Sequence, residues 1–235
     1  MRTVNGISSI FLMGLVTIAG GSLIPASALA GCSDGSSPGV KWDGCRKRNL
    51  MIGGSDLSGA SMIKTDLTGT DLREVNLTGA NLTKSTMTRA VASNSILVNA
   101  DLSRIQGTRT NFSTSNLSGA KFFKAELARA DFSGSDLSGA NFNKSEFSRS
   151  NFSGANLSNV DMSFANLSRS QFAGATVAGM NLEKSWTYLA RFEGLDLSAV
   201  RNLTQEQVEL ACGNAETKLP EGLTVPASWP CNDDG

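Results

Sequence analysis

Histidine is absent from this 235-residue chain, and tyrosine occurs only once. Without histidine, a Ser-His-Asp triad and a histidine-assisted cysteine nucleophile are both excluded. The four cysteines lie far apart, which argues against a metal site built from them. The glycines form no phosphate-binding loop that ends in Lys-Ser or Lys-Thr. We therefore predict that the protein is not an enzyme and holds no metal or other cofactor.

Aromatic residues are few, at 6%, and the chain has no excess of either charge, with 21 Lys and Arg against 21 Asp and Glu. Removing residues 1–30 takes away one Arg and no acidic residue, which leaves 20 basic residues against 21 acidic ones. The chain therefore has no global field that would hold nucleic acid or an anionic membrane. We expect no nucleic-acid partner.

Long apolar runs are also missing, except near the N-terminus. Arg2 precedes the run ISSIFLMGLVTIAGG, Pro25 ends it, and a small-residue cleavage signal finishes at Ala30. This pattern is typical of a signal peptide over residues 1–30, and the run is shorter than the roughly 20 residues of a membrane span. It predicts a mature protein that begins at Gly31 and is exported to the periplasm or the extracellular space.

The cysteines fall as one pair at each end of the mature chain, Cys32 with Cys45 and Cys212 with Cys231. In an exported protein this arrangement favours two terminal disulfides. A second interpretation stays open, because Leu29-Ala30-Gly31-Cys32 resembles a bacterial lipobox. Lipidation of Cys32 would anchor the protein in a membrane and leave Cys45 unpaired.

A repeat of five residues dominates the rest of the chain. From Ile52 to Leu197, Leu, Phe, Met, Ile or Val fills 27 of 30 central positions, and Ala92, Gly107 and Thr187 fill the others. Neither a helix nor a strand has a period of five. A second period of twenty lies over the first, since GAKFFKAELARADFSGSDLS at 119–138 aligns with GANFNKSEFSRSNFSGANLS at 139–158.

Four pentapeptides per coil would place equivalent residues in stacked columns. One column contains five phenylalanines, Phe112, Phe132, Phe152, Phe172 and Phe192. At about 4.8 Å between neighbouring strands, such rings would contact one another along the axis. Residues 86–107 contain two of the three exceptions, so we expect a looser wall there.

The units SDLSG at 135–139, ANLSN at 155–159 and ADFSG at 130–134 closely resemble the A(D/N)LXX motif of the pentapeptide-repeat family. The resemblance implies an all-β fold, a right-handed quadrilateral β-helix of about seven 20-residue coils over residues 50–200. We expect an N-terminal cap with one cysteine pair at 31–49, where Trp42 covers the opening. Over 201–235 we expect a short capping helix and a tail, because Thr204 and Gln207 have capping-box spacing and Gly213 can end a helix.

Charge at the fifth position of the repeat is not required by the fold. One column carries Lys64, Lys84, Arg104, Lys124, Lys144, Phe164 and Lys184, and the neighbouring column carries Gly69, Arg89, Arg109, Arg129, Arg149, Arg169 and Leu189. These stripes either dock an acidic partner or keep the protein soluble and its walls apart. Some outward residues are apolar and either pack under the tail or contact a partner or a second copy. They are Phe123, Phe164, Trp186 and Leu189, of which the last three lie toward the C-terminal end.

The sequence thus predicts an exported, non-catalytic solenoid that acts as a rigid interaction or structural module in the cell envelope. Its partner would be a protein or an acidic envelope component, and a homodimer is compatible with the pattern. Two alternatives stay open, a lipoprotein anchored through Cys32 and a DNA-mimicking protein that binds a topoisomerase. The second comes from the family resemblance, and the lack of a dominant acidic stripe argues against it.

Overall fold

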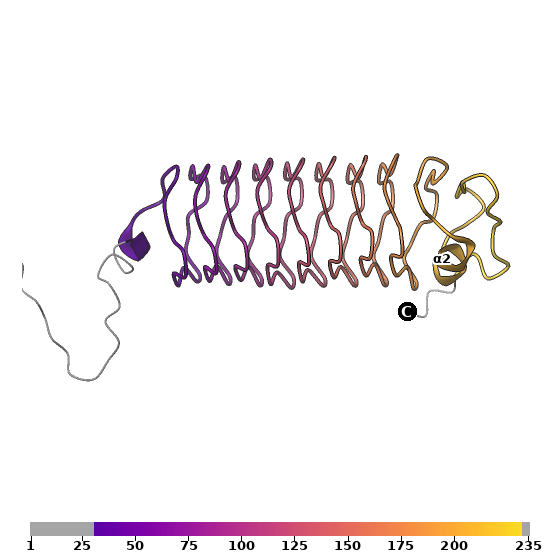
Figure 1. Cartoon of the computed structure of the whole chain (residues 1–235), viewed down its shortest axis with the longest axis horizontal. Coiled ribbons are helices and arrows are strands. Elements are labelled where there is room, and N and C mark those ends of the chain that lie inside the picture. The colour runs from indigo at the N-terminus through magenta and orange to yellow at the C-terminus, as the bar shows by residue number, and fades with distance from the viewer. Residues whose placement is uncertain (1–30, 232–235) are drawn as a thin grey trace, which may run out of the picture.

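The computed structural model describes residues 31–231 as a rod of stacked coils (Figure 1). A 3-10 helix, η1 (Gly31–Ser33), lies at one end, and an α-helix, α2 (Gln205–Leu210), lies at the other. Between the two helices, extended structure within residues 31–231 consists of isolated bridge residues. The expected signal peptide, residues 1–30, lies outside the described residues.

The coils are held together by parallel bridges between residues twenty apart, such as Asn111 with Asp131 and Asp131 with Asn151. The bridges recur every five residues, and a turn separates each from the next, so each coil has four sides. The backbone follows the same register, since the amide of Phe112 donates to the carbonyl of Asp131 at 2.7 Å. The expected spacing of one coil per twenty residues is confirmed.

The interior is filled by the central residues of the repeat. The phenylalanine column stacks as expected, with ring centroids 5.2 Å apart between Phe112 and Phe132 and 5.1 Å apart between Phe132 and Phe152. Neighbouring columns meet edge to face, as Phe142 and Phe147 do at 4.7 Å. Both arrangements suit the aromatic quadrupole. A narrow tube thus holds a continuous apolar core along its length.

Small polar side chains also point inward, where their hydroxyls bond the backbone. Thr110 Oγ1 donates to the carbonyl of Met87 at 2.8 Å, and Ser150 Oγ donates to that of Leu127 at 2.8 Å. In the described part of the chain, Ser85 Oγ is the buried side-chain oxygen without a partner. The serines and threonines inside the tube therefore stabilise the fold through hydrogen bonds to the backbone, and they offer no exposed nucleophile.

The looser wall expected over residues 86–107 is not present. Bridges join Thr86 to Gln106 and Val91 to Asn111, and the amide of Gly107 donates to the carbonyl of Glu126 at 2.8 Å. The backbone ladder needs no particular side chain, and Leu127 fills the space beside Gly107, where an added Cβ would lie 2.6 Å from its Cδ2. The small central residues are thus tolerated without loss of regularity.

The regular pattern begins earlier than the sequence indicates, with a bridge between Lys41 and Ser61. Trp42 and Lys47 occupy central positions, so Trp42 lies inside the first coil and does not cover its opening, contrary to expectation. Trp42 Nε1 and Lys47 Nζ both donate to the carbonyl of Asp34, at 3.1 and 3.3 Å. The pattern is hidden in the sequence because Lys47 is not apolar.

The C-terminal end is closed by α2, which has the expected capping box between Thr204 and Gln207. Val208 is buried, as expected for a residue packed over the last coil. Gln207 is also buried, and its Nε2 donates to the carbonyls of Leu182 and Ser185 at 2.7 and 2.8 Å. The amide thus satisfies carbonyls that a further coil would otherwise bond.

The end of α2 differs from the prediction. Ala211 is the C-cap, two residues before Gly213. A Cβ at Gly213 would lie 2.2 Å from the ring of Trp229, so this glycine admits a close ring and does not terminate the helix. Beyond α2 the bridged residues are no longer twenty positions apart in the sequence, since Arg191 bridges to Cys212, 21 positions further on. The last turn of chain is therefore a cap rather than a standard coil.

Both expected disulfides are present. Cys32 is bonded to Cys45 and Cys212 to Cys231, each with Cα atoms 5.4 Å apart. The first fixes η1 against the first coil, and the second fixes the tail beside the C-terminal end of α2. No free cysteine occurs in the described residues.

Inserting one alanine after Leu137 should move every later residue out of register with the preceding coil. Stacked rings and bridges share that register. We therefore expect the free energy of unfolding to fall by at least about 3 kcal/mol, the order of magnitude for a disrupted core. Thermal and urea unfolding followed by circular dichroism would measure it. A matched alanine inserted after Gly35, in the exposed segment 33–39 of the N-terminal cap, should leave the melting curve unchanged. Parental stability of the first variant would contradict the register.

Gln207→Ala should lower the free energy of unfolding by about 2 kcal/mol, because it removes half of the capping box and two hydrogen bonds to buried carbonyls. Glu206→Ala, one residue earlier and exposed, is the control and should change stability by no more than about 0.5 kcal/mol. Urea titration would measure both. Equal stability of the two variants would show that the Gln207 amide does not close the tube.

Candidate functional site

In nearly every pentapeptide the fifth residue forms a corner of the coil and adopts a left-handed backbone conformation. Gly134 and Gly139 have φ of 64° and 66°, and Arg129 and Lys144 have φ of 59° and 60°. Glycine takes this conformation without steric cost, whereas other L-residues are strained by about 1 kcal/mol. The corner is therefore a position where lysine and arginine are conformationally unfavourable.

Two adjacent corners nevertheless carry basic residues along much of the rod. We call them the Lys column and the Arg column, and their ten predicted interaction residues have φ between 52° and 61°. These residues are Lys84, Arg104, Lys124, Lys144 and Lys184 in the Lys column, and Arg89, Arg109, Arg129, Arg149 and Arg169 in the Arg column. All are exposed except Arg169, which is half-buried.

Within residues 31–231, none of these ten cations forms an ion pair. The ion pairs of that region join other residues, such as Arg73 with Asp71 and Lys218 with Asp196. Asp131 and Glu146, which lie near the columns, instead accept backbone amides two residues ahead, those of Ser133 and Ser148, at 3.0 Å. The columns therefore project positive charge that the protein itself does not neutralise.

The Lys column contains one aromatic member, Phe164, which is 44% exposed. Lys144 Nζ lies 5.7 Å from the centroid of this ring and Lys184 Nζ lies 5.3 Å from it. These contacts are within cation–π range. The ring thus bridges two lysines across the gap that it makes in the column.

Between the two columns lies one side of the rod, which we call the basic face. Its outward residues follow two lines along the axis, and most are uncharged and polar. They are Asp66, Thr86, Gln106, Glu126, Glu146, Asn166 and Trp186 in one line, and Thr68, Thr88, Thr108, Ala128, Ser148, Ser168 and Tyr188 in the other. Asp66, at the N-terminal end, is paired with Arg48 on the same face. The face thus offers hydroxyl, amide and carboxylate groups between two rows of cations.

Two aromatic side chains end the basic face near α2. Trp186 is 51% exposed and Tyr188 is 43% exposed, so the described tail leaves both open. The prediction that Trp186 packs under the C-terminal tail is therefore wrong. Leu189, in the same group of residues, is half-buried. Their backbones belong to the regular wall, because Trp186 bridges to Asn166 and Arg169 N–H donates to the Tyr188 carbonyl at 2.9 Å. The sequence pattern pointed to Trp186 but missed Tyr188.

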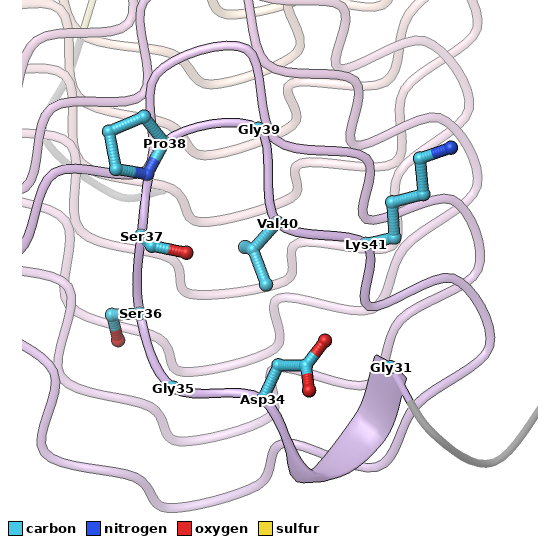
Figure 2. A pocket seen from close by; sticks show the side chains of 9 residues that line it. All are labelled: Gly31, Asp34, Gly35, Ser36, Ser37, Pro38, Gly39, Val40 and Lys41. Carbon is cyan, nitrogen blue, oxygen red and sulfur yellow. The ribbon is translucent and has the colours of Figure 1, made fainter.

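A shallow pocket opens at the N-terminal end of the rod, beside η1 (Figure 2). It is lined by Gly31, Asp34, Gly35, Ser36, Ser37, Pro38, Gly39, Val40 and Lys41. Beneath it, Lys47 is 8% exposed and lies 4.1 Å from the centroid of Trp42. Burial lowers the pKa of the Lys47 ammonium, against the opposing effect of Asp34. Because Lys47 bonds the Asp34 carbonyl, its role is to hold the cap.

Other shifted groups are explained by turns and ion pairs. The side-chain hydrogen bond from Arg73 lowers the pKa of Asp71 to about 2, and the bond from Ser198 lowers that of Asp196 to about 2. In the described region, no group of three or more carboxylate or cysteine side chains could hold a metal ion. None of these carboxylates is placed for acid–base chemistry, so the basic face is the candidate site.

Comparison with known proteins supports the same architecture. The family model for pentapeptide repeats matches eight copies over residues 53–89, 86–122 and 125–163. A trypsin-treated variant of QnrB1, a plasmid-mediated fluoroquinolone resistance protein, is similar in structure with a TM-score of 0.51 and 17% identity, covering 79% of this chain and 91% of that one. A comparison with curated protein sequences gives no match.

Two further solved structures have the same kind of repeat. HetL of the cyanobacterium Nostoc sp. strain PCC 7120, a protein involved in the regulation of heterocyst differentiation, has 22% identity and a TM-score of 0.36, covering 80% of this chain and 92% of that one. A thylakoid-lumen protein of Arabidopsis thaliana has 22% identity and a TM-score of 0.20, covering 71% and 80%. With its matched repeats, its twenty-residue register and its four-sided coils, the chain belongs to the pentapeptide-repeat family, whose members fold as right-handed quadrilateral β-helices.

Proposed function

We propose that this protein is an exported, non-catalytic module of the cell envelope that docks an acidic partner on its Lys and Arg columns. Pentapeptide-repeat proteins generally serve as structural or interaction modules, and this chain adds a charged surface to that scaffold. The rod is rigid because backbone hydrogen bonds join each coil to the next over most of its length. It therefore presents its cations at fixed intervals.

The observation that carries the proposal is the choice of residue at the strained corners. Glycine fills most of the other two corner columns, for example Gly54, Gly134 and Gly154 in one of them. Lysine and arginine at the equivalent left-handed positions are less favourable by about 1 kcal/mol each. Solubility alone does not require that cations occupy these positions, since exposed positions without strain are available on every coil. A binding role accounts for the placement.

Export is supported by the covalent structure. Two disulfides are expected where the surroundings are oxidising, and none of the described cysteines is free. The described region contains no helix of sufficient length and apolarity to span a membrane. The bond between Cys32 and Cys45 also favours cleavage after Ala30 over lipidation, which would use the Cys32 sulfur.

The columns have the opposite charge from the one that a DNA mimic needs. A protein that imitates the phosphate backbone must present rows of acidic groups, whereas these corners present lysine and arginine. The similarity to QnrB1, at 17% identity, concerns the fold. Binding of an acidic partner is therefore the function that the surface supports best.

Reversing two charges in the Arg column, with Arg129→Glu and Arg149→Glu together, should weaken binding of a polyanion by about tenfold, as expected for the loss of two exposed charge contacts. The test ligands are polygalacturonate, polyphosphate and phosphatidylglycerol vesicles, measured by biolayer interferometry at several NaCl concentrations. Affinity should also fall as salt rises.

The matched control reverses Lys41 and Lys121, two exposed lysines on a neighbouring face, to glutamate. It changes the net charge by the same amount and should retain binding. Circular dichroism should be unchanged in both variants. Failure of all three ligands to bind, or an equal loss in both variants, would refute docking on the columns.

Mass spectrometry of the protein isolated from whole cultures of its native host, cells and medium together, tests export. We expect a mature chain that begins at Gly31, carries both disulfides and reacts with iodoacetamide only after reduction. A chain that begins at a diacylglycerol-modified Cys32 would establish the lipoprotein alternative. A chain that retains Met1 and four free thiols would contradict export altogether.

A further inference from the structure

We propose that the acidic partner is a linear polysaccharide bearing carboxylates, which lies lengthwise along the basic face and places one sugar ring on Trp186 and Tyr188. This inference rests on the proposed function and identifies the class of partner and the residues that recognise it. It depends on three features of the face, which are its two rows of cations, its polar centre and its aromatic end.

The dimensions of the basic face suit a single extended chain. Residues at its two edges, such as Lys124 and Arg129, are five positions apart, and five residues span at most about 17 Å. Neighbouring coils lie about 4.8 Å apart, which is comparable to the length of one sugar ring. A carboxylated polysaccharide lying along the axis can therefore meet a cation from either column at successive coils.

The centre of the face favours a sugar chain over a phosphate chain. Glu126 and Glu146 project between the columns, and the Glu146 carboxylate also accepts from Asn166 Nδ2 at 2.8 Å. Carboxylates there would repel the continuous charge of polyphosphate or a nucleic acid. They can accept hydrogen bonds from sugar hydroxyls, and Thr108, Ser148 and similar residues can both donate and accept. A hydroxylated chain whose carboxylates are spaced by a whole sugar ring matches this mixture.

The aromatic end supplies the contact that charge alone would not. Trp186 and Tyr188 are outward residues two positions apart on one side of the coil, separated by the buried Thr187. The face of an aromatic ring carries partial negative charge, so it attracts the C–H groups that line one face of a sugar ring. Lys184 occupies the corner next to Trp186. On the other side, the half-buried Arg169 lies in the Arg column one coil earlier, so positive charge flanks this end of the face. A sugar carboxylate beside a stacked ring would thus meet a cation.

Trp186→Ala combined with Tyr188→Ala is the test variant, with polygalacturonate as the carboxylated probe and dextran as the neutral one. We expect wild-type protein to bind polygalacturonate and not dextran. The double variant should bind about tenfold more weakly, as the loss of two aromatic contacts implies. In the wild type, polygalacturonate should protect tryptophan fluorescence from acrylamide, because Trp42 is buried, Trp229 is half-buried and Trp186 is the exposed fluorophore.

Ile96→Ala is the matched control, since Ile96 is 46% exposed on a different side of the rod. It should leave affinity unchanged, and all variants should keep the melting curve of the parent. Loss of binding on reversal of Arg129 and Arg149, with none in the aromatic variant, would overturn this inference and leave the proposed function standing. Preference for polyphosphate, single-stranded DNA or vesicles would also overturn it, and absence of binding to every polyanion would overturn both.

Discussion

The structure depends on a single constraint, the alignment of each residue with the one twenty positions further on. The backbone bonds and the interior stacking share this alignment, as the Phe132 and Phe152 rings show at 5.1 Å and an interplanar angle of 4°. Neither can shift without the other, so the coil is uniform even where Ala92 and Gly107 replace large central residues. The same constraint turns any residue repeated every twenty positions into a straight line on the surface.

A tube of this kind must close its ends, because its terminal coils would otherwise leave backbone groups and apolar rings in contact with water. Both ends use a polar side chain at a buried position. Lys47 bonds the Asp34 carbonyl at one end, and Gln207 bonds the carbonyls of Leu182 and Ser185 at the other. Each end is then fixed by a disulfide. Hydrogen bonds and a disulfide therefore close each end in addition to side-chain packing.

The corners connect the fold to its surface chemistry. They are the points at which the backbone is left-handed, and they are also where side chains extend away from the rod. Glycine would relieve the strain, so lysine and arginine in two adjacent columns represent a local cost of about 1 kcal/mol at each position. The packed core can sustain that cost because it is continuous. Stability contributed by the interior thus permits a charged pattern on the exterior that the fold does not need.

The sequence by itself determined the coil length, the buried column of rings and the capping box at Thr204, since each is written as a spacing between residues. It left the pairing of Cys32 with Cys45 open against lipidation, and the structure shows the bond. Only the tertiary structure showed that the first coil begins near Lys41, that Gly213 accommodates the ring of Trp229, and that Tyr188 stands open beside Trp186. The physical reason is that a period fixes which residues stack. Exposure, strain at the corners and the irregular caps arise from contacts between residues that no repeat relates.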